Sequence, residues 1–204
     1  MKKLSLLLLA ALLVLSCTAC GQEKGAEKMP LKEKTASASA MTEGKGDHKT
    51  LVVYFSATGR TARLAKTLAD TLQADILELQ PAQPYTEQDL DYNTPGTRAT
   101  AEQRDENARP QLAGSLGDLK QYDTVYLGYP IWWGLAPRLL YTFVETADLS
   151  GKRVIPFCTS GGGGMGASGE ALAAAAKGRG NWLGGREFTP GAGSAELKNW
   201  ADKL

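Results

Sequence analysis

Residues 51–61 read LVVYFSATGRT, and this stretch carries the clearest structural signal in the chain. Its first five residues are apolar and β-prone without polar alternation, which is typical of a strand buried on both faces of a parallel sheet. Leu64, Leu68 and Leu72 then recur every fourth residue, which predicts an amphipathic helix beginning at about Thr61. A strand therefore leads into a helix through a short loop of small and hydroxyl-bearing residues.

That loop, residues 56–61, has the chemistry of an anion site. The first backbone N–H groups of a helix have no partner within the helix, and the helix dipole favours negative charge there. Ser56, Thr58 and Thr61 can add hydroxyl donors, and Gly59 can adopt backbone angles that other residues avoid. The alternative is that these hydroxyls simply cap the helix, as in many strand–helix turns. Taken alone, the loop leaves both interpretations open.

The rest of the chain alternates strands with helices. This pattern indicates an α/β fold of βαβ units in one parallel sheet with right-handed crossovers. About five strands are expected. The predicted strands lie at 51–55, 75–79, 124–130, 153–158 and near 187–188, and helices are predicted to begin near Thr61, Thr97, Pro137, Ser168 and Ser194.

Residues 85–110 interrupt this alternation with a long polar segment, in which a short helix is predicted over 97–107. Such a segment in a compact domain is either a solvated crossover or a functional element. The sequence leaves open whether it closes over a ligand or binds a partner.

Three loops follow buried strands directly, at 56–61, 130–134 and 159–164. Ligands of open parallel sheets bind beyond the carboxyl ends of the strands, where the strand order reverses. The second loop has two adjacent tryptophans, whose indole faces can stack on a flat ring. The third has four consecutive glycines, which let the backbone approach a planar ligand closely. Together the loops predict a site for a molecule with a phosphate tail and a flat, hydrogen-bonding head, which describes FMN.

The adjacent tryptophans, Trp132 and Trp133, have two interpretations: they pack in the core, or they cover the ligand. On an extended backbone, neighbouring side chains point to opposite sides. At least one of the two is therefore expected to face the ligand, and the sequence does not say which one stacks on the ring.

These motifs resemble those of the flavodoxin family. SATGRT at 56–61 resembles the phosphate loop of flavodoxins, and YPIWWG at 129–134 resembles the ring-covering loop of flavodoxin-like proteins and their quinone-reductase relatives. TSGG at 159–162 resembles their third loop. The resemblance spans roughly residues 50–204. It implies a flavodoxin-like three-layer αβα sandwich, a five-stranded parallel sheet of order 2-1-3-4-5 and non-covalently bound FMN.

The three loops supply the expected cofactor-binding residues. No catalytic residue and no metal ligand is expected, because a flavin carries its own chemistry. Arg60 departs from the small polar residue usual in flavodoxins, and either pairs with the phosphate or points to solvent. The expected binding residues are Ser56, Ala57, Thr58, Gly59, Arg60, Thr61, Pro130, Ile131, Trp132, Trp133, Gly134, Thr159, Ser160, Gly161, Gly162 and Gly163.

Residues 1–20 resemble a bacterial lipoprotein signal peptide. Two lysines precede an apolar run, residues 4–15, which is short for a membrane span. Cys20 follows small residues and is the expected lipidation site, with Cys17 the less favoured acceptor. A redox or zinc site at this C-x-x-C is disfavoured, because no second cysteine pair accompanies it.

Residues 21–48 are rich in Lys, Glu, Ala, Ser and Gly without apolar periodicity, and are predicted to be a flexible polar tether. Residues 49–204 suffice for one domain. This organisation predicts a domain held by a lipid anchor on the extracytoplasmic face of a bacterial cell membrane. Without Lys2 and Lys3 the chain has 21 basic and 22 acidic residues and no basic patch, so no nucleic-acid partner is expected.

The expected function is FMN-dependent electron transfer or oxidoreduction. A redox partner protein, a quinone or NAD(P)H would be the partner, and the choice between a pure electron shuttle and a quinone reductase-like enzyme stays open. The near-neutral charge differs from the strongly acidic surface of electron-shuttling flavodoxins. The alternative is a non-enzymatic binding lipoprotein that keeps the flavodoxin fold for another phosphorylated ligand or partner.

Overall fold

The computed structural model describes residues 50–204, so the predicted signal peptide, the tether and Cys20 lie outside the described residues. All paired strands run parallel, and their order confirms the predicted 2-1-3-4-5 sheet. In spatial order the strands are β2 (Asp75–Glu78), β1 (Thr50–Tyr54), β3 (Thr124–Pro130), β4 (Arg153–Thr159) and β5 (Asn181–Trp182), and β6 (Arg186–Glu187) also pairs with β4.

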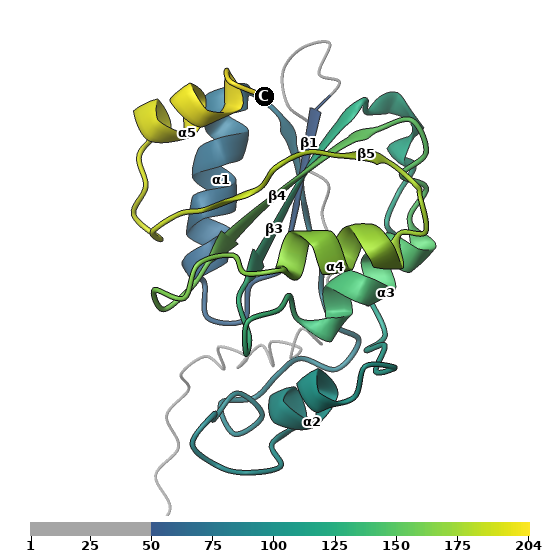
Figure 1. Cartoon of the computed structure of the whole chain (residues 1–204), viewed down its shortest axis with the longest axis vertical. Coiled ribbons are helices and arrows are strands. Elements are labelled where there is room, and N and C mark those ends of the chain that lie inside the picture. Colours follow the sequence, from purple (N-terminus) through teal and green to yellow (C-terminus); the bar gives the residue numbers. More distant parts are fainter. Residues whose placement is uncertain (1–49) are drawn as a thin grey trace, which may run out of the picture. The chain divides into compact units, whose positions relative to one another are not determined.

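Helices cover both faces of the sheet (Figure 1), which confirms the three-layer αβα sandwich. α1 packs beside α5 on one face, and α3 packs beside α4 on the other. No helix within residues 50–204 has the length and apolar character needed to cross a membrane. The helices that cover the sheet are α1 (Arg60–Leu72), α3 (Arg138–Thr146), α4 (Ser168–Ala175) and α5 (Ser194–Ala201), and a 3-10 turn, η1, lies at Leu119–Gln121.

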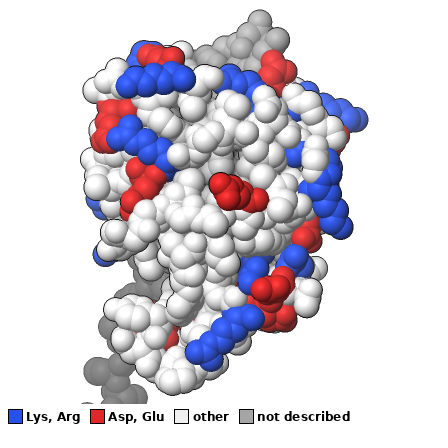
Figure 2. Space-filling model, viewed as in Figure 1, with Lys and Arg blue, Asp and Glu red and all other residues white. Residues whose placement is uncertain are grey.

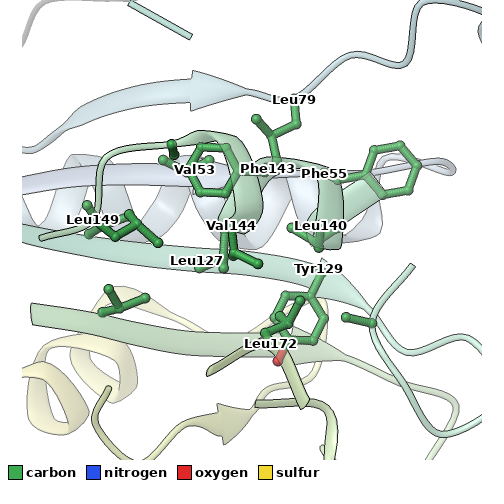
Figure 3. Close-up of a cluster of buried hydrophobic side chains, with 14 of the residues drawn as sticks. Val53, Phe55, Leu79, Leu127, Tyr129, Leu140, Phe143, Val144, Leu149 and Leu172 are labelled. Atoms are coloured by element: carbon green, nitrogen blue, oxygen red, sulfur yellow. The ribbon is translucent and has the colours of Figure 1, made fainter. Parts of the chain in front are cut away.

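The two covered faces explain why β1 is apolar at nearly every position. Leu51 and Val53 lie in one buried cluster, whereas Val52 and Tyr54 lie in a second cluster, with residues of α1 and α5. Successive strand residues point to opposite faces, and here each face is buried. Figure 3 shows the first cluster, in which Phe143 of α3 packs near Val53.

The last strand position is filled by two short segments rather than the single strand predicted near residues 187–188. On this side of β4, the carbonyl of Val154 accepts from Leu183 N–H at 2.9 Å. Four residues on, the carbonyl of Cys158 accepts from Phe188 N–H at 2.9 Å. Pro156 lies between these two positions and has no N–H to donate. The sheet edge is therefore interrupted opposite Pro156, which separates β5 from β6.

The connection from β2 to β3 contains α2 (Arg98–Arg104), within the predicted 97–107 helix. Pro81 and Leu112 form an antiparallel bridge, and two backbone hydrogen bonds of 2.7 Å join 80–82 to 111–113. These pairings form a neck that closes the segment 83–110, here called the cap segment. In Figure 1, α2 lies beyond the carboxyl ends of the strands rather than against a face of the sheet.

Candidate cofactor site

A cavity of about 460 Å³ lies at the carboxyl ends of β1, β3 and β4, where the three predicted loops meet. All but four of the predicted binding residues line it; Gly59, Gly134, Gly162 and Gly163 do not. The cap segment adds three residues that the sequence did not single out. The lining residues are Ser56, Ala57, Thr58, Arg60, Thr61, Leu90, Tyr92, Ala99, Pro130, Ile131, Trp132, Trp133, Thr159, Ser160 and Gly161.

The first loop presents a row of backbone donors. Within the described chain, none of the N–H groups of residues 56–62 donates a hydrogen bond; the first donor of α1 is Arg63, to Gly59 at 3.1 Å. Gly59 precedes α1 with a φ of 80°, and no side chain caps the helix. The hydroxyls of this loop therefore do not cap α1, which was the alternative interpretation. A row of free N–H groups at a helix N-terminus is suited to an anion.

Ser56 is the clearest polar anomaly of this loop. Its hydroxyl oxygen is buried and has no hydrogen-bond partner within the described chain. Leaving such a group unsatisfied costs about 1–3 kcal/mol. Because Ser56 lines the cavity, a ligand with acceptor oxygens there would satisfy this hydroxyl.

Thr61 and Thr159 tie the first loop to the third. Their hydroxyl oxygens lie 2.9 Å apart, and both side chains are buried. Both residues line the cavity, and the contact joins the start of α1 to the end of β4. It fixes the spacing between the row of N–H groups and the third loop, residues 159–164, here called the glycine loop.

The two tryptophans form part of a tight turn. Trp132 and Leu135 exchange backbone hydrogen bonds of 2.9 and 3.1 Å, which leaves Trp133 and Gly134 as the central residues. Their φ values are 48° and 80°, the left-handed combination of a type I′ turn. Gly134 adopts this conformation freely, whereas a bulky residue such as Trp133 is strained there.

This turn separates the roles of the two indoles. Trp132 packs edge-on against Phe55 at 5.8 Å and Tyr85 at 5.4 Å between ring centroids. Trp133 is 53% exposed. Both line the cavity, so Trp132 is a fixed wall and Trp133 is a projecting rim.

The cap segment reaches the cavity through Leu90, Tyr92 and Ala99. Tyr85 donates a hydrogen bond to Glu102, which also accepts from Arg98 at 2.7 Å, so the segment has its own small polar core. Burial and the neighbouring carboxylate raise the pKa of Tyr85 above its usual range, which keeps the phenol neutral.

Gln103 at the end of the cap segment's helix holds the tryptophan turn. Its side-chain amide donates to the carbonyls of Trp132 at 2.9 Å and Ala136 at 3.2 Å. Its own backbone carbonyl accepts from buried Arg138 of α3 at 3.0 Å. The cap segment, the turn and α3 are thus linked through one residue.

The third loop is shaped by Ser160. Its hydroxyl donates to Glu187 of β6 and accepts from the N–H groups of Gly162 at 2.9 Å and Gly163 at 3.0 Å. Gly161 lines the cavity, whereas Gly162 and Gly163 do not. Glu187 was not expected at this site, because its position follows from the pairing of β6 with β4.

The cavity wall contains one cation and no carboxylate. Arg60 is exposed, and it makes no ion pair with any residue from 50 to 204. Within the same residues no cluster of His, Cys, Asp or Glu could hold a metal ion.

Figure 2 shows acidic and basic residues interspersed around one face, with a mostly uncharged centre, so this face carries no large field of one sign.

Leu90, Tyr92 and Ala99 were missed because they come from the polar segment whose role the sequence left open. The available signal was Leu90 and Tyr92 themselves, two large apolar side chains within an otherwise polar run. Through these residues the cap segment forms part of the cavity wall.

Comparisons with known proteins match the chain over this same region. The family model described as Flavodoxin matches residues 49–204. A putative flavoprotein from Bacteroides uniformis is 44% identical, with a TM-score of 0.72 over 76% of this chain and 98% of that chain. One from Bacteroides eggerthii is 41% identical, with a TM-score of 0.72 over 76% and 96%.

A more distant flavoprotein from Lactobacillus acidophilus, solved in complex with FMN, shares the fold. It is 20% identical, with a TM-score of 0.61 over 76% of this chain and 99% of that chain. None of the curated proteins compared with the chain matches it.

Proposed function

This chain belongs to the flavodoxin family, and we propose that it binds FMN in the cavity at the carboxyl ends of β1, β3 and β4. The observation that carries this proposal is the first loop. It combines a row of free N–H groups, the unpartnered Ser56 hydroxyl and a nearby arginine in one wall of a cavity that contains no carboxylate. These are the features that a phosphate group requires.

The FMN phosphate would lie against residues 56–61, with Arg60 beside it. The ring would lie toward Trp132, Trp133 and Gly161, which supply aromatic surface and glycine backbone to the cavity wall. The FMN complex of the Lactobacillus acidophilus flavoprotein, which shares the fold, supports this choice of ligand.

Bound FMN supplies the redox chemistry, and the residues of the chain bind it, orient it and limit its contact with water. No side chain of the cavity is assigned as an acid or base. The partner would be a redox protein, a quinone or NAD(P)H, and it would meet the ring at the exposed Trp133 rim.

We further propose that the domain works outside the cytoplasmic membrane on a lipid anchor at Cys20. The support for this is the signal-like segment at 1–20 and the polar tether at 21–48. A Cys20→Ser variant that still fractionated with membranes would count against lipidation at this cysteine.

The decisive experiment is an absorbance spectrum of the purified chain, followed by titration with FMN. Yellow protein that releases FMN on denaturation, or apo protein that binds FMN stoichiometrically, is the expected result. Colourless protein that ignores added FMN would overturn the proposal and favour a binding lipoprotein for another ligand.

Oxidation of NADH or NADPH by the FMN-loaded chain, with a quinone as acceptor, then separates two kinds of redox protein. Turnover would identify a reductase. Intact FMN without turnover would identify an electron shuttle that depends on a protein partner.

A further inference from the structure

Glu187 contacts a residue of the cavity wall but does not itself line the cavity. Its carboxylate accepts a hydrogen bond from the hydroxyl of Ser160, which lines the cavity, and the carboxylate makes no ion pair with residues 50–204. A Cβ added to Gly164 would lie 4.0 Å from its other oxygen, so the carboxylate sits under the glycine loop.

The hydrogen bonds of Ser160 form an ordered relay. Because the Ser160 hydroxyl donates its hydrogen bond to Glu187, its lone pairs are directed to the N–H groups of Gly162 and Gly163. Glycine-rich backbone has little conformational preference of its own. The shape of the loop therefore depends on this relay, and the relay depends on the carboxylate.

We infer that Glu187 is a positioning residue that holds the glycine loop through Ser160 and makes the bound cofactor harder to reduce. The first effect is geometric, because the relay places Gly161 in the wall. The second is electrostatic: the partly buried carboxylate is not neutralised by a cation, and a fixed negative charge opposes added electrons nearby. This inference rests on the proposed FMN site.

Two substitutions separate these effects in the FMN-loaded full chain. Glu187→Gln keeps an acceptor for Ser160 but removes the charge. Affinity for oxidised FMN should stay within about threefold, and affinity for reduced FMN should rise about tenfold. A tenfold change corresponds to a two-electron potential higher by about 30 mV. Glu187→Ala removes both effects, so affinity for oxidised FMN should also fall about tenfold.

The relay itself is tested by non-additivity. Ser160→Ala should weaken binding of oxidised FMN about tenfold, and adding Glu187→Ala should weaken it no further, because the two residues act in one chain of hydrogen bonds. The control is Glu170→Gln, which removes an exposed carboxylate of α4 away from the wall.

Equal potentials in the wild-type chain and the Glu187→Gln variant, or an equal shift in the Glu170→Gln control, would overturn the electrostatic effect. Additive losses in the double variant would overturn the relay. A wild-type chain that does not bind FMN is a different outcome, since it removes the proposed function itself.

Discussion

The Ser56 hydroxyl is expected to lower the stability of the apo protein and to strengthen ligand binding. In the described chain this buried oxygen has no partner, although it lies in the wall of the cavity. A residue selected only for stability would be alanine there. The proposed FMN phosphate would account for the hydroxyl, because a hydrogen bond to a charged group contributes about 1.5–3 kcal/mol.

Ser56→Ala should therefore change stability and affinity in opposite directions. Urea unfolding of the apo protein should show equal or greater stability, because a buried unsatisfied group is removed. Titration should show FMN affinity lower by roughly 10–100-fold.

Ser168→Ala is the matched control, since that buried hydroxyl donates to the Met165 carbonyl at 2.7 Å and lies 3.1 Å from the Tyr129 hydroxyl. It should lower stability by about 1 kcal/mol and leave FMN affinity unchanged. Equal FMN affinity in wild type and Ser56→Ala would refute the role given to this hydroxyl.

Trp133 is likewise expected to lower the stability of the fold while it strengthens FMN binding, here because of its backbone conformation. Its φ of 48° suits glycine, and holding a larger residue there costs about 1–3 kcal/mol. Trp133→Gly should raise the stability of the apo protein by up to about 1 kcal/mol, because the exposed indole contributes little burial.

FMN affinity of the Trp133→Gly variant should fall about tenfold, since an aromatic stacking contact contributes about 0.5–1.5 kcal/mol. Trp132→Gly provides the contrast. It should destabilise the fold by at least 2 kcal/mol through its lost contacts with Phe55 and Tyr85. A destabilised Trp133→Gly protein would show that the indole supports the fold rather than the ligand.

Among the elements, the sheet edge between β5 and β6 is held by close packing rather than by strand pairing. A Cβ at Gly185 would lie 2.6 Å from the Pro156 carbonyl oxygen and 2.6 Å from the Met165 sulfur. At Gly184 it would meet nothing within 4 Å. Gly185→Ala should thus cost about 1–3 kcal/mol in urea unfolding, whereas Gly184→Ala should change stability by less than about 0.5 kcal/mol. Similar effects of the two substitutions would contradict this account of the interruption.

Helix α2 should act on the site through Gln103. Gln103→Ala removes two hydrogen bonds to the carbonyls that flank the tryptophan turn, so the turn should lose its fixed position. We expect about tenfold weaker FMN binding and greater mobility of the indoles in tryptophan fluorescence anisotropy. Gln111→Ala, which changes an exposed residue of the neck, should change neither measurement. Unchanged anisotropy in Gln103→Ala would show that the turn holds its shape without the cap segment.

The elements that the sequence predicted well are those whose signal is local. The apolar run of β1 and the four-residue spacing of α1 are properties of adjacent residues, and both elements form within a residue or two of the expected bounds. The split of the last strand was not predictable in this way. It depends on Pro156 facing that strand rather than β3, which is settled only by the assembled sheet.

The site residues likewise fall into those with a local sequence signal and those that depend on long-range pairing. Three loops could be placed together because the carboxyl ends of parallel strands share one edge, whatever the details of packing. The contributions of Leu90 and Glu187 depend on long-range pairings: the neck at Pro81 and Leu112, and the register of β6 on β4. Neither pairing leaves a periodic pattern in the sequence, so neither residue could be assigned before the fold was known.

For the whole molecule, burial of weak acids sets the alkaline limit of stability. Burial raises the pKa of the Cys158 thiol from 9.0 to about 12, with a smaller effect from Glu187. Burial likewise raises the pKa of five tyrosines above their usual range. These are Tyr54, Tyr85, Tyr126, Tyr129 and Tyr141.

The unfolded chain releases these protons at lower pH than the folded chain, so the free energy of unfolding should fall as the pH rises above about 9. Cys158 acts first, at up to about 1.4 kcal/mol per pH unit, and the tyrosines add a steeper loss above about pH 10. Urea unfolding between pH 7 and 11 measures this dependence. Cys158→Ala should lower the slope from about pH 9 upward, and the additional loss from the tyrosines above about pH 10 should remain. A free energy independent of pH up to 11 would contradict the prediction.

The broken edge opposite Pro156 also bears on self-association. An exposed edge strand can template the pairing of another chain, which leads to aggregates. Here β5 and β6 have two residues each, and the gap between them prevents a continuous ladder. Even at high protein concentration, a second copy of the chain would find no continuous edge strand to pair with on this side of the sheet. We therefore expect no strand addition along this edge.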